Sequence, residues 1–134
     1  MNYWLLKTEP FTYSWNDLVR DKKSVWDGIR NYQARNYMAE MKKGDLALIY
    51  HTGSAKEVVG IARISKAAWP DPADKEWNVV EVTPVNKLKN PVPLSVIKSN
   101  MAFTDMVLLK NSRLSVQPVM RAEFDRIVAI SENK

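Results

Sequence analysis

Residues 26–35 gather side chains that are suited to binding a flat, polar ring. An aromatic face stacks on a nucleobase, a guanidinium adds a cation–π contact or a fork of donors, and a carboxamide both donates and accepts along a base edge. The residues of these types in the segment are Trp26, Arg30, Asn31, Tyr32 and Arg35. The same pattern also fits a turn that leads into a helix with core aromatic residues, so binding and structure both stay open as its role.

Three further candidates lie where predicted strands end. His51 follows the apolar residues 46–50, where its imidazole either hydrogen-bonds a ligand at a pocket mouth or holds the turn that begins there. Lys7 and Glu9 flank Thr8, either as an ion pair or as charges presented to a ligand. Spacing alone does not separate a structural role from a binding role for these residues.

Aromatic residues concentrate in the N-terminal part of the chain, since nine of the thirteen lie within the first fifty residues. A hydrophobic core does not require such a bias, so we expect some of them to line a binding site. A single aromatic residue at helical spacing, such as Tyr37, is nonetheless expected in the core.

Common catalytic signatures are missing from the sequence. The four glycines form neither a dinucleotide fingerprint nor a P-loop. With no cysteine and one histidine, a zinc or iron site would need an unusual set of carboxylate ligands. A Ser-His-acid triad through His51 and Asp27 or Glu9 is formally possible, but no nucleophile elbow accompanies it. We therefore expect no catalytic residues, no metal and no other cofactor.

Length and composition indicate one globular domain spanning residues 1–134. Hydrophobic residues make up 46% of the chain and charged residues 26%. The longest apolar run, 46–50, is far too short to span a membrane, and the N-terminus lacks the features of a signal peptide. With the absence of cysteine, these observations predict a cytoplasmic protein without a membrane partner. The oligomeric state stays open between monomer and weak dimer.

The chain is basic, with a net charge of +5 and a pI near 9.5. This charge favours a polyanionic or phosphate-bearing partner. The basic residues are spread along the chain in pairs, without a basic tail or a basic helix. Only a folded surface that gathers them would follow a phosphate backbone.

Runs of branched and aromatic residues between turn signals predict five strands. They cover residues 3–7, 46–50, 58–65, 77–85 and 108–117. The middle three follow one another through short connections, including a loop at 70–72, which suggests a meander. No alternation of strands and helices indicates a parallel Rossmann-type sheet.

Capping signals and helical spacing predict four helical segments. A Ser14–Asp17 capping box opens a helix over 15–21, and Asn31 caps a second one that basic residues and Gly44 end. The buried face of this second helix is expected to hold Ala34, Tyr37, Met38 and Met41. One helical turn over 94–98 and a final helix complete the pattern. Together the segments indicate an α+β domain with a curled or barrel-like sheet and helices packed outside.

Six ordered motifs run nearly from one end of the chain to the other. They are Tyr-Trp-Leu-Leu-Lys-Thr-Glu-Pro at 3–10, Tyr-Ser-Trp at 13–15, Trp-Asp-Gly-Ile-Arg-Asn-Tyr-Gln-Ala-Arg at 26–35, Gly-Asp at 44–45, Tyr-His at 50–51 and Arg-Leu-Ser-Val-Gln-Pro at 113–118. These motifs resemble those of the EVE domain family, which includes thymocyte nuclear protein. The resemblance implies a PUA-like fold, a mixed β pseudo-barrel surrounded by helices, with kinship to YTH domains that read methylated adenine through an aromatic cage.

The resemblance also implies a reader of modified bases and carries a set of ligand-binding residues onto this chain. These are Lys7, Glu9, Tyr13, Ser14, Trp15, Trp26, Arg30, Asn31, Tyr32, Arg35, His51, Arg113 and Ser115. Two positions depart from the family pattern, with Trp69 in place of a commoner tyrosine and Met120 in place of a polar cap for the last helix. The short segment between 67 and 77 resembles that of bacterial, stand-alone members.

Residues and resemblance together predict a non-catalytic module that binds DNA or RNA carrying a modified base, such as methylated or hydroxymethylated cytosine. The base is expected to stack on Trp26, so that Trp26→Ala removes most of the specific affinity. Two alternatives stay open. One is an enzyme that acts on a modified nucleobase or nucleotide with Glu9 or Asp27 as the acid or base, and the other is a small-metabolite sensor that uses the same pocket.

Overall fold

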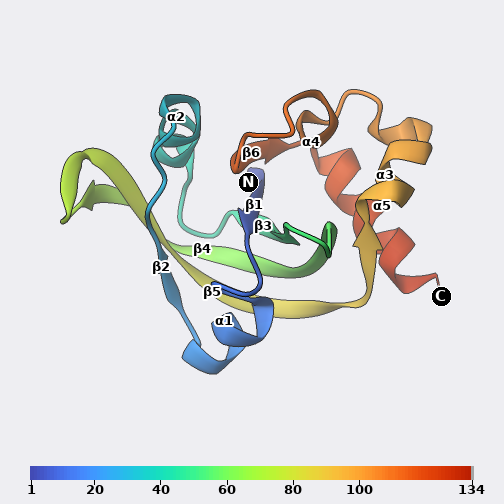
Figure 1. The fold of residues 1–134 in the computed structure, drawn as a ribbon, viewed down its shortest axis with the longest axis horizontal. Coiled ribbons are helices and arrows are strands. Elements are labelled where there is room, and N and C mark those ends of the chain that lie inside the picture. Colours follow the sequence, from blue (N-terminus) through green and yellow to red (C-terminus); the bar gives the residue numbers. More distant parts are fainter. Residues whose placement is uncertain (134) are drawn as a thin grey trace.

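A six-stranded sheet forms the centre of the computed structural model, which describes residues 1–133 (Figure 1). The strands are β1 (Tyr3–Thr8), β2 (Ser24–Trp26), β3 (Leu46–His51), β4 (Glu57–Asp71), β5 (Asp74–Pro93) and β6 (Val116–Val119). The helices found in this part of the chain are α1 (Trp15–Asp21), α2 (Tyr32–Glu40), α3 (Leu94–Ser99), the 3-10 helix η1 (Met101–Phe103), α4 (Val107–Lys110) and α5 (Arg121–Glu132). None of the helices in residues 1–133 is long and apolar enough to cross a membrane.

The strands follow the order β2-β5-β4-β3-β1-β6 across the sheet. β3, β4 and β5 form the predicted meander, with antiparallel pairing throughout. β1 instead lies parallel to β3, with Tyr3 opposite Leu46 and Thr8 opposite His51. Parallel strands need a crossover connection, which α1, β2 and α2 supply. The last residues of β1 and β3 therefore meet at the same end of the sheet.

The architecture is α+β, as the sequence predicts, and the sheet is mixed. β2 and β6 are the edge strands, and within residues 1–133 no hydrogen-bonded pairing joins them. The sheet is therefore not closed into a barrel. The expected pseudo-barrel is an open sheet with a strongly curved β4–β5 ribbon, and helices lie around it (Figure 1).

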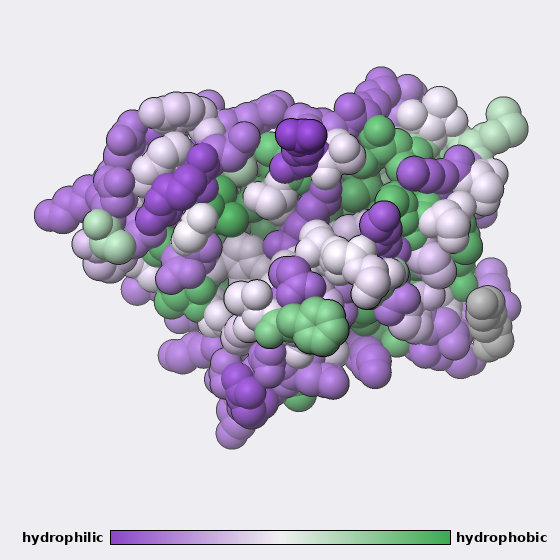
Figure 2. Space-filling view, in the orientation of Figure 1, coloured by the Kyte–Doolittle hydropathy of each residue, from purple (hydrophilic) through white to green (hydrophobic). Residues whose placement is uncertain are grey.

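Apolar side chains pack on both faces of the sheet. Successive residues of a strand point to opposite faces, so Trp4 and Leu6 belong to one core and Leu5 to the other. The first core includes buried residues of α1 and α2, and the second includes those of α3, η1, α4 and α5. On the face seen in Figure 2, hydrophilic side chains predominate, and apolar groups show mainly in the recesses between elements.

The predicted N-terminal caps of α1 and α2 are confirmed. Asp17 N donates to Ser14 Oγ over 3.1 Å and Ser14 N donates to Asp17 Oδ2 over 2.9 Å, which completes the capping box of α1. At the start of α2, Ala34 N donates to Asn31 Oδ1 over 2.9 Å. α2 ends at Glu40, before the basic residues expected in its last turn.

The strand predicted over residues 108–117 is wrong in its first half. α4 occupies residues 107–110, and β6 begins only at Val116, which lies opposite Leu6 of β1. Leu108 is buried in the second core from a helical turn. A short apolar run fits a helical turn and a strand equally well, so the pattern alone did not distinguish them.

The loop expected at residues 70–72 lies at the tip of a long hairpin. β4 continues to Asp71 and β5 begins at Asp74, well beyond the residues that pair with β3. Several register shifts interrupt this two-stranded ribbon, and such irregular places tolerate a proline like Pro70. The strand predicted over 58–65 is thus the first half of β4, and the strand predicted over 77–85 lies within β5.

Candidate functional site

Two adjoining cavities open beside the end of β1 and share Lys7, Thr8 and Glu9 as a common wall. The first, called the aromatic pocket, has a volume of about 430 Å³ and is bordered also by Tyr13, Ser24, Val25, Trp26, Asp27 and Ile29. The second, called the basic pocket, has a volume of about 540 Å³ and is bordered also by Tyr50, Lys56, Lys98, Ser112, Arg113 and Ser115. Both volumes lie within the range of small-molecule sites.

The end of β1 brings distant parts of the chain together at this site. Lys7 N donates to the Ser115 carbonyl oxygen over 2.9 Å, which holds the segment before β6 alongside β1. Lys7 Nζ donates to the carbonyl oxygen of Ser112 over 2.7 Å, although the two residues are 105 positions apart. Of the predicted site residues, Lys7, Glu9, Arg113 and Ser115 thus gather at the basic pocket.

Tyr13 and Trp26 supply the aromatic part of the first pocket. Their ring centroids are 6.1 Å apart and their planes are inclined by 83°, which is an edge-to-face contact. Trp26 is only 7% exposed, and its indole belongs to the first core. Tyr13 is half-buried. A ligand in this pocket therefore has more of Tyr13 to contact than of Trp26, the residue on which the sequence predicts stacking.

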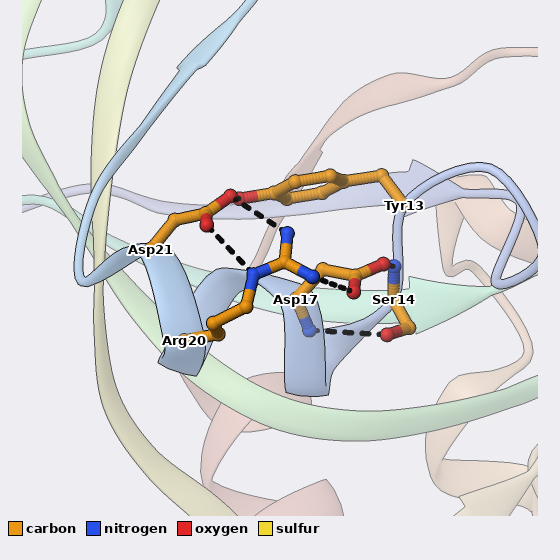
Figure 3. A network of polar contacts seen from close by, with 5 residues as sticks. All are labelled: Tyr13, Ser14, Asp17, Arg20 and Asp21. Carbon is orange, nitrogen blue, oxygen red and sulfur yellow. Dashed lines mark hydrogen bonds and ion pairs between the residues drawn. The ribbon is translucent and has the colours of Figure 1, made fainter.

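A polar network fixes the position of the Tyr13 side chain (Figure 3). Tyr13 Oη donates to Asp21 Oδ2 over 2.9 Å, and Arg20 Nε donates to Asp21 Oδ1 over 2.9 Å. Arg20 also reaches Asp17 Oδ1 over 3.0 Å, so that the capping box of Ser14 and Asp17 joins the network. The hydrogen bond from Arg20 lowers the pKa of Asp21, and burial raises the pKa of Tyr13. Ser14, a predicted site residue, caps α1 and borders neither pocket.

The turn between β1 and α1 fixes Glu9 between the two pockets. Thr12 N and Tyr13 N donate to the Glu9 carbonyl oxygen over 2.9 and 2.8 Å, and Phe11 N donates to Glu9 Oε2 over 2.8 Å. Thr8 Oγ1 closes the turn by donating to the Tyr13 carbonyl oxygen over 2.6 Å. The backbone thus sets the position of this carboxylate.

The basic pocket collects positive charge. Four cations and one carboxylate border it: Lys7, Lys56, Lys98, Arg113 and Glu9. Lys7 Nζ also lies 5.8 Å from the ring centroid of Tyr50, and burial lowers the pKa of Lys7. The other three cations are exposed, and none of them pairs with a carboxylate in residues 1–133.

Trp15 and His51 border neither of the two pockets. Trp15 N donates to His51 Nε2 over 3.0 Å, and the Trp15 side chain is 4% exposed in the first core. Burial lowers the pKa of His51. Both residues border a separate small cavity of about 160 Å³.

The structure divides the segment 26–35 between two places. Trp26 reaches the aromatic pocket, whereas Arg30, Tyr32 and Arg35 contact the β4–β5 hairpin. The Tyr32 and Trp77 ring centroids are 5.0 Å apart, and the Arg35 guanidinium lies 4.8 Å from the Tyr32 centroid. Asn31 caps α2.

Sequence reasoning missed several residues of the two pockets. Thr8, Ser24 and Ile29 border the aromatic pocket, and Lys56 and Lys98 border the basic one. Thr8 and Ile29 lie inside the motifs 3–10 and 26–35 but have side chains without a base-binding signature, whereas Ser24, Lys56 and Lys98 lie in no motif. Of the early aromatic residues, Tyr13, Trp26 and Tyr50 border the two cavities, and their part in binding stays a prediction.

Fold and site together define an α+β domain with a two-part groove at the end of a parallel strand pair. A model of the EVE domain matches residues 2–130, and the chain belongs to this family. The structure of the protein Rpa0253 from Rhodopseudomonas palustris is 39% identical, covers 98% of this chain and 93% of its own, and superimposes with a TM-score of 0.94.

Two vertebrate relatives match along nearly the whole chain. Thymocyte nuclear protein 1 of Mus musculus is 34% identical over an alignment that covers 99% of this chain and 75% of the mouse protein. Human THYN1 protein, solved as a crystal structure in complex with 5-methylcytosine containing DNA, is 29% identical. The match covers 100% of this chain and 99% of the human one, with a TM-score of 0.93.

Proposed function

We propose that this protein binds DNA carrying a modified cytosine and holds the modified base in the aromatic pocket without converting it. The proposal is carried by one observation, the aromatic pocket beside a basic pocket at the end of β1. The human relative crystallised with 5-methylcytosine containing DNA supports it, since that structure shares the fold over the whole chain.

The lining of the aromatic pocket suits a cytosine. The carboxylates of Glu9 and Asp27 are acceptors, and the exocyclic amino group of cytosine is a donor to such groups. Val25 and Ile29 offer apolar surface to a 5-methyl group, and Tyr13 offers an aromatic ring to the base. A base can reach this pocket from a single strand or by flipping out of a duplex.

The proposal is tested by measuring dissociation constants of oligonucleotides that differ only in one central base. Cytosine, 5-methylcytosine, 5-hydroxymethylcytosine and, separately, N6-methyladenine are compared in single- and double-stranded DNA and in RNA, at two salt concentrations. We expect tighter binding of a modified cytosine than of cytosine in DNA. Equal dissociation constants for modified and unmodified strands would refute the proposal that the protein recognises the modified base.

A matched pair of tyrosine variants tests whether the aromatic pocket holds the modified base. Tyr13 and Tyr37 are both half-buried, but Tyr37 contacts Trp4 at 6.1 Å between centroids and borders neither pocket. Loss of one base-stacking side chain costs about 1 to 3 kcal/mol of binding free energy. Tyr13→Leu is therefore expected to weaken binding of the modified strand at least fivefold, and Tyr37→Leu to leave it unchanged. A conservative Trp26→Phe is used in place of alanine, because Trp26 also supports the core.

Mass spectrometry separates binding from catalysis. After prolonged incubation with the protein, modified nucleosides and oligonucleotides are expected to keep their masses. A product would instead favour an enzyme with Glu9 or Asp27 as acid or base. Equal affinity for a free nucleoside and for the oligonucleotide, without salt dependence, would favour a small-metabolite sensor.

A further inference from the structure

The two adjoining pockets differ in the kind of chemical group they suit. The aromatic pocket carries one cation, Lys7, with two carboxylates, Glu9 and Asp27. The basic pocket carries four cations with Glu9 as its carboxylate. A neutral ring therefore fits the first pocket, and an anion fits the second.

We infer that the basic pocket is a subsite for a backbone phosphate next to the modified base, so that a nucleic-acid strand crosses the shared wall of Lys7, Thr8 and Glu9. The inference rests on the proposed function, because it takes the aromatic pocket as the site of the base. The proposed subsite is formed by Lys56, Lys98, Ser112 and Arg113 together with Lys7. Of the first four residues, only Arg113 belongs to a family motif.

Lys7 is the residue that connects the two pockets. Its ammonium group can donate three hydrogen bonds, and one of them goes to the carbonyl oxygen of Ser112 over 2.7 Å. The remaining protons are available to a phosphate oxygen at the boundary of the two pockets. Lys7 is partly buried, which lowers its pKa, and a neighbouring anion would offset this loss of solvation.

The other cations approach the basic pocket from separate elements. Lys56 precedes β4, Lys98 lies in α3 and Arg113 follows α4. All three are exposed, and no carboxylate in residues 1–133 pairs with them, so their charges are available to a phosphate. Leu94 and Leu108 border the same pocket and offer apolar surface to a sugar ring.

Charge-neutral variants test the subsite with the full chain. Lys98→Gln and Arg113→Gln remove pocket charges, and Lys43→Gln is the matched control, because Lys43 lies before the start of β3, at the far end from the pockets. Each pocket variant is expected to lower the salt slope of oligonucleotide binding by about one and affinity at low salt by about threefold to tenfold. The ratio of modified to unmodified affinity and the Lys43→Gln slope are expected to stay unchanged.

A neutral methylphosphonate linkage, placed on one side or the other of a central 5-methylcytosine, locates the contact. We expect one of the two positions to weaken wild-type binding by about as much as Arg113→Gln, and the combination to weaken it little further, because both changes remove the same contact. Fully additive losses at both positions, or a loss of base discrimination in Lys98→Gln or Arg113→Gln, would overturn the subsite.

The outcomes for the two proposals are distinguishable in the same titrations. Coupling between Arg113 and one linkage without any preference for the modified base supports the phosphate subsite and refutes the base reader. A preference for the modified base without such coupling refutes the subsite alone. Absence of oligonucleotide binding by the wild type refutes both.

Discussion

The backbone N–H of Trp15 donates to Nε2 of His51 over 3.0 Å, and this bond ties the first turn of α1 to the last residue of β3. His51 is the last residue of the strand that pairs with β1, and α1 carries the network of Asp17, Arg20 and Asp21 that fixes Tyr13 (Figure 3). The histidine predicted to bind a ligand thus holds the element beside the pocket, and its direct part in binding stays a prediction.

Protonation of His51 is expected to destabilise the fold, because Nε2 accepts a hydrogen bond only when it is unprotonated. Burial lowers the pKa of His51 in the folded state, while Glu57 and Glu9 oppose this shift. The folded pKa lies below the unfolded one, so the unfolded chain binds the proton more readily. The contribution of His51 is full above about pH 6.5 and is lost as the pH falls through the folded pKa.

His51→Gln isolates this effect, because glutamine supplies an uncharged acceptor of similar reach. We expect its free energy of unfolding at pH 7.5 to lie within about 1 kcal/mol of the wild type. When the pH is lowered from 7.5 to 5, the free energy of unfolding measured in urea is expected to fall more for the wild type than for His51→Gln. Identical pH dependence of the two proteins would contradict the prediction.

Gly60 is expected to tolerate no side chain, because a Cβ there would lie 2.6 Å from the Trp15 ring. Overpacking of this kind destabilises a core by about 1 to 3 kcal/mol, so Gly60→Ala is expected to lower the melting temperature measured by circular dichroism. In a Trp15→Leu background the alanine is expected to cost less, since the indole is gone. An equal cost in both backgrounds would rule out the steric explanation.

Asp45 is expected to be a strong determinant of stability. It is 3% exposed, and its carboxylate accepts from Trp4 Nε1 over 3.0 Å, from Lys42 N over 2.9 Å and from Asn2 N over 3.1 Å. Burial alone raises the pKa of Asp45, but these hydrogen bonds and the N-terminal ammonium lower it further than burial raises it.

Asp45→Ala leaves three donors without their acceptor and is expected to lower the free energy of unfolding at pH 7 by about 2 to 4 kcal/mol. Because the folded pKa is depressed, the wild-type advantage is full above the unfolded pKa and declines as the pH falls through the folded one. Urea titrations at pH 7 and pH 3 are expected to show a smaller difference at pH 3. An equal difference in the free energy of unfolding at both pH values would indicate that the charge of Asp45 does not contribute to stability.

Arg30 is expected to hold the β4–β5 hairpin. Its Nη2 lies 3.1 Å from Oδ2 of Asp71, whose side chain is 6% exposed, and its guanidinium lies 5.6 Å from the Trp77 ring centroid. Arg30→Ala is expected to lower stability by about 1 kcal/mol, because the arginine side chain is itself 40% exposed and partly screened.

The same variant tests the role in binding that the sequence predicts for Arg30. An unchanged ratio of modified to unmodified affinity, with the stability loss, is the outcome expected from its position outside both pockets. A fall in that ratio would show a direct or transmitted contribution to base recognition.

Local features of the sequence determined most elements. The caps of α1 and α2 depend on side chains three residues from the groups they bind, so Ser14, Asp17 and Asn31 identified both helix starts. The meander followed from strand-forming runs separated by turn signals. The EVE motifs in the first 35 residues likewise belong to single continuous stretches. All of these features act within a few residues, which is why a linear pattern reveals them.

Only the tertiary structure decided how these elements meet. Parallel pairing places β3 beside β1, and the Lys7 to Ser115 bond joins segments more than a hundred residues apart at the same site. The fold also directed Trp26 to the aromatic pocket and Arg30 to the hairpin, although one motif contains both. Strand pairing and the direction of each side chain depend on long-range packing, and sequence spacing does not encode them.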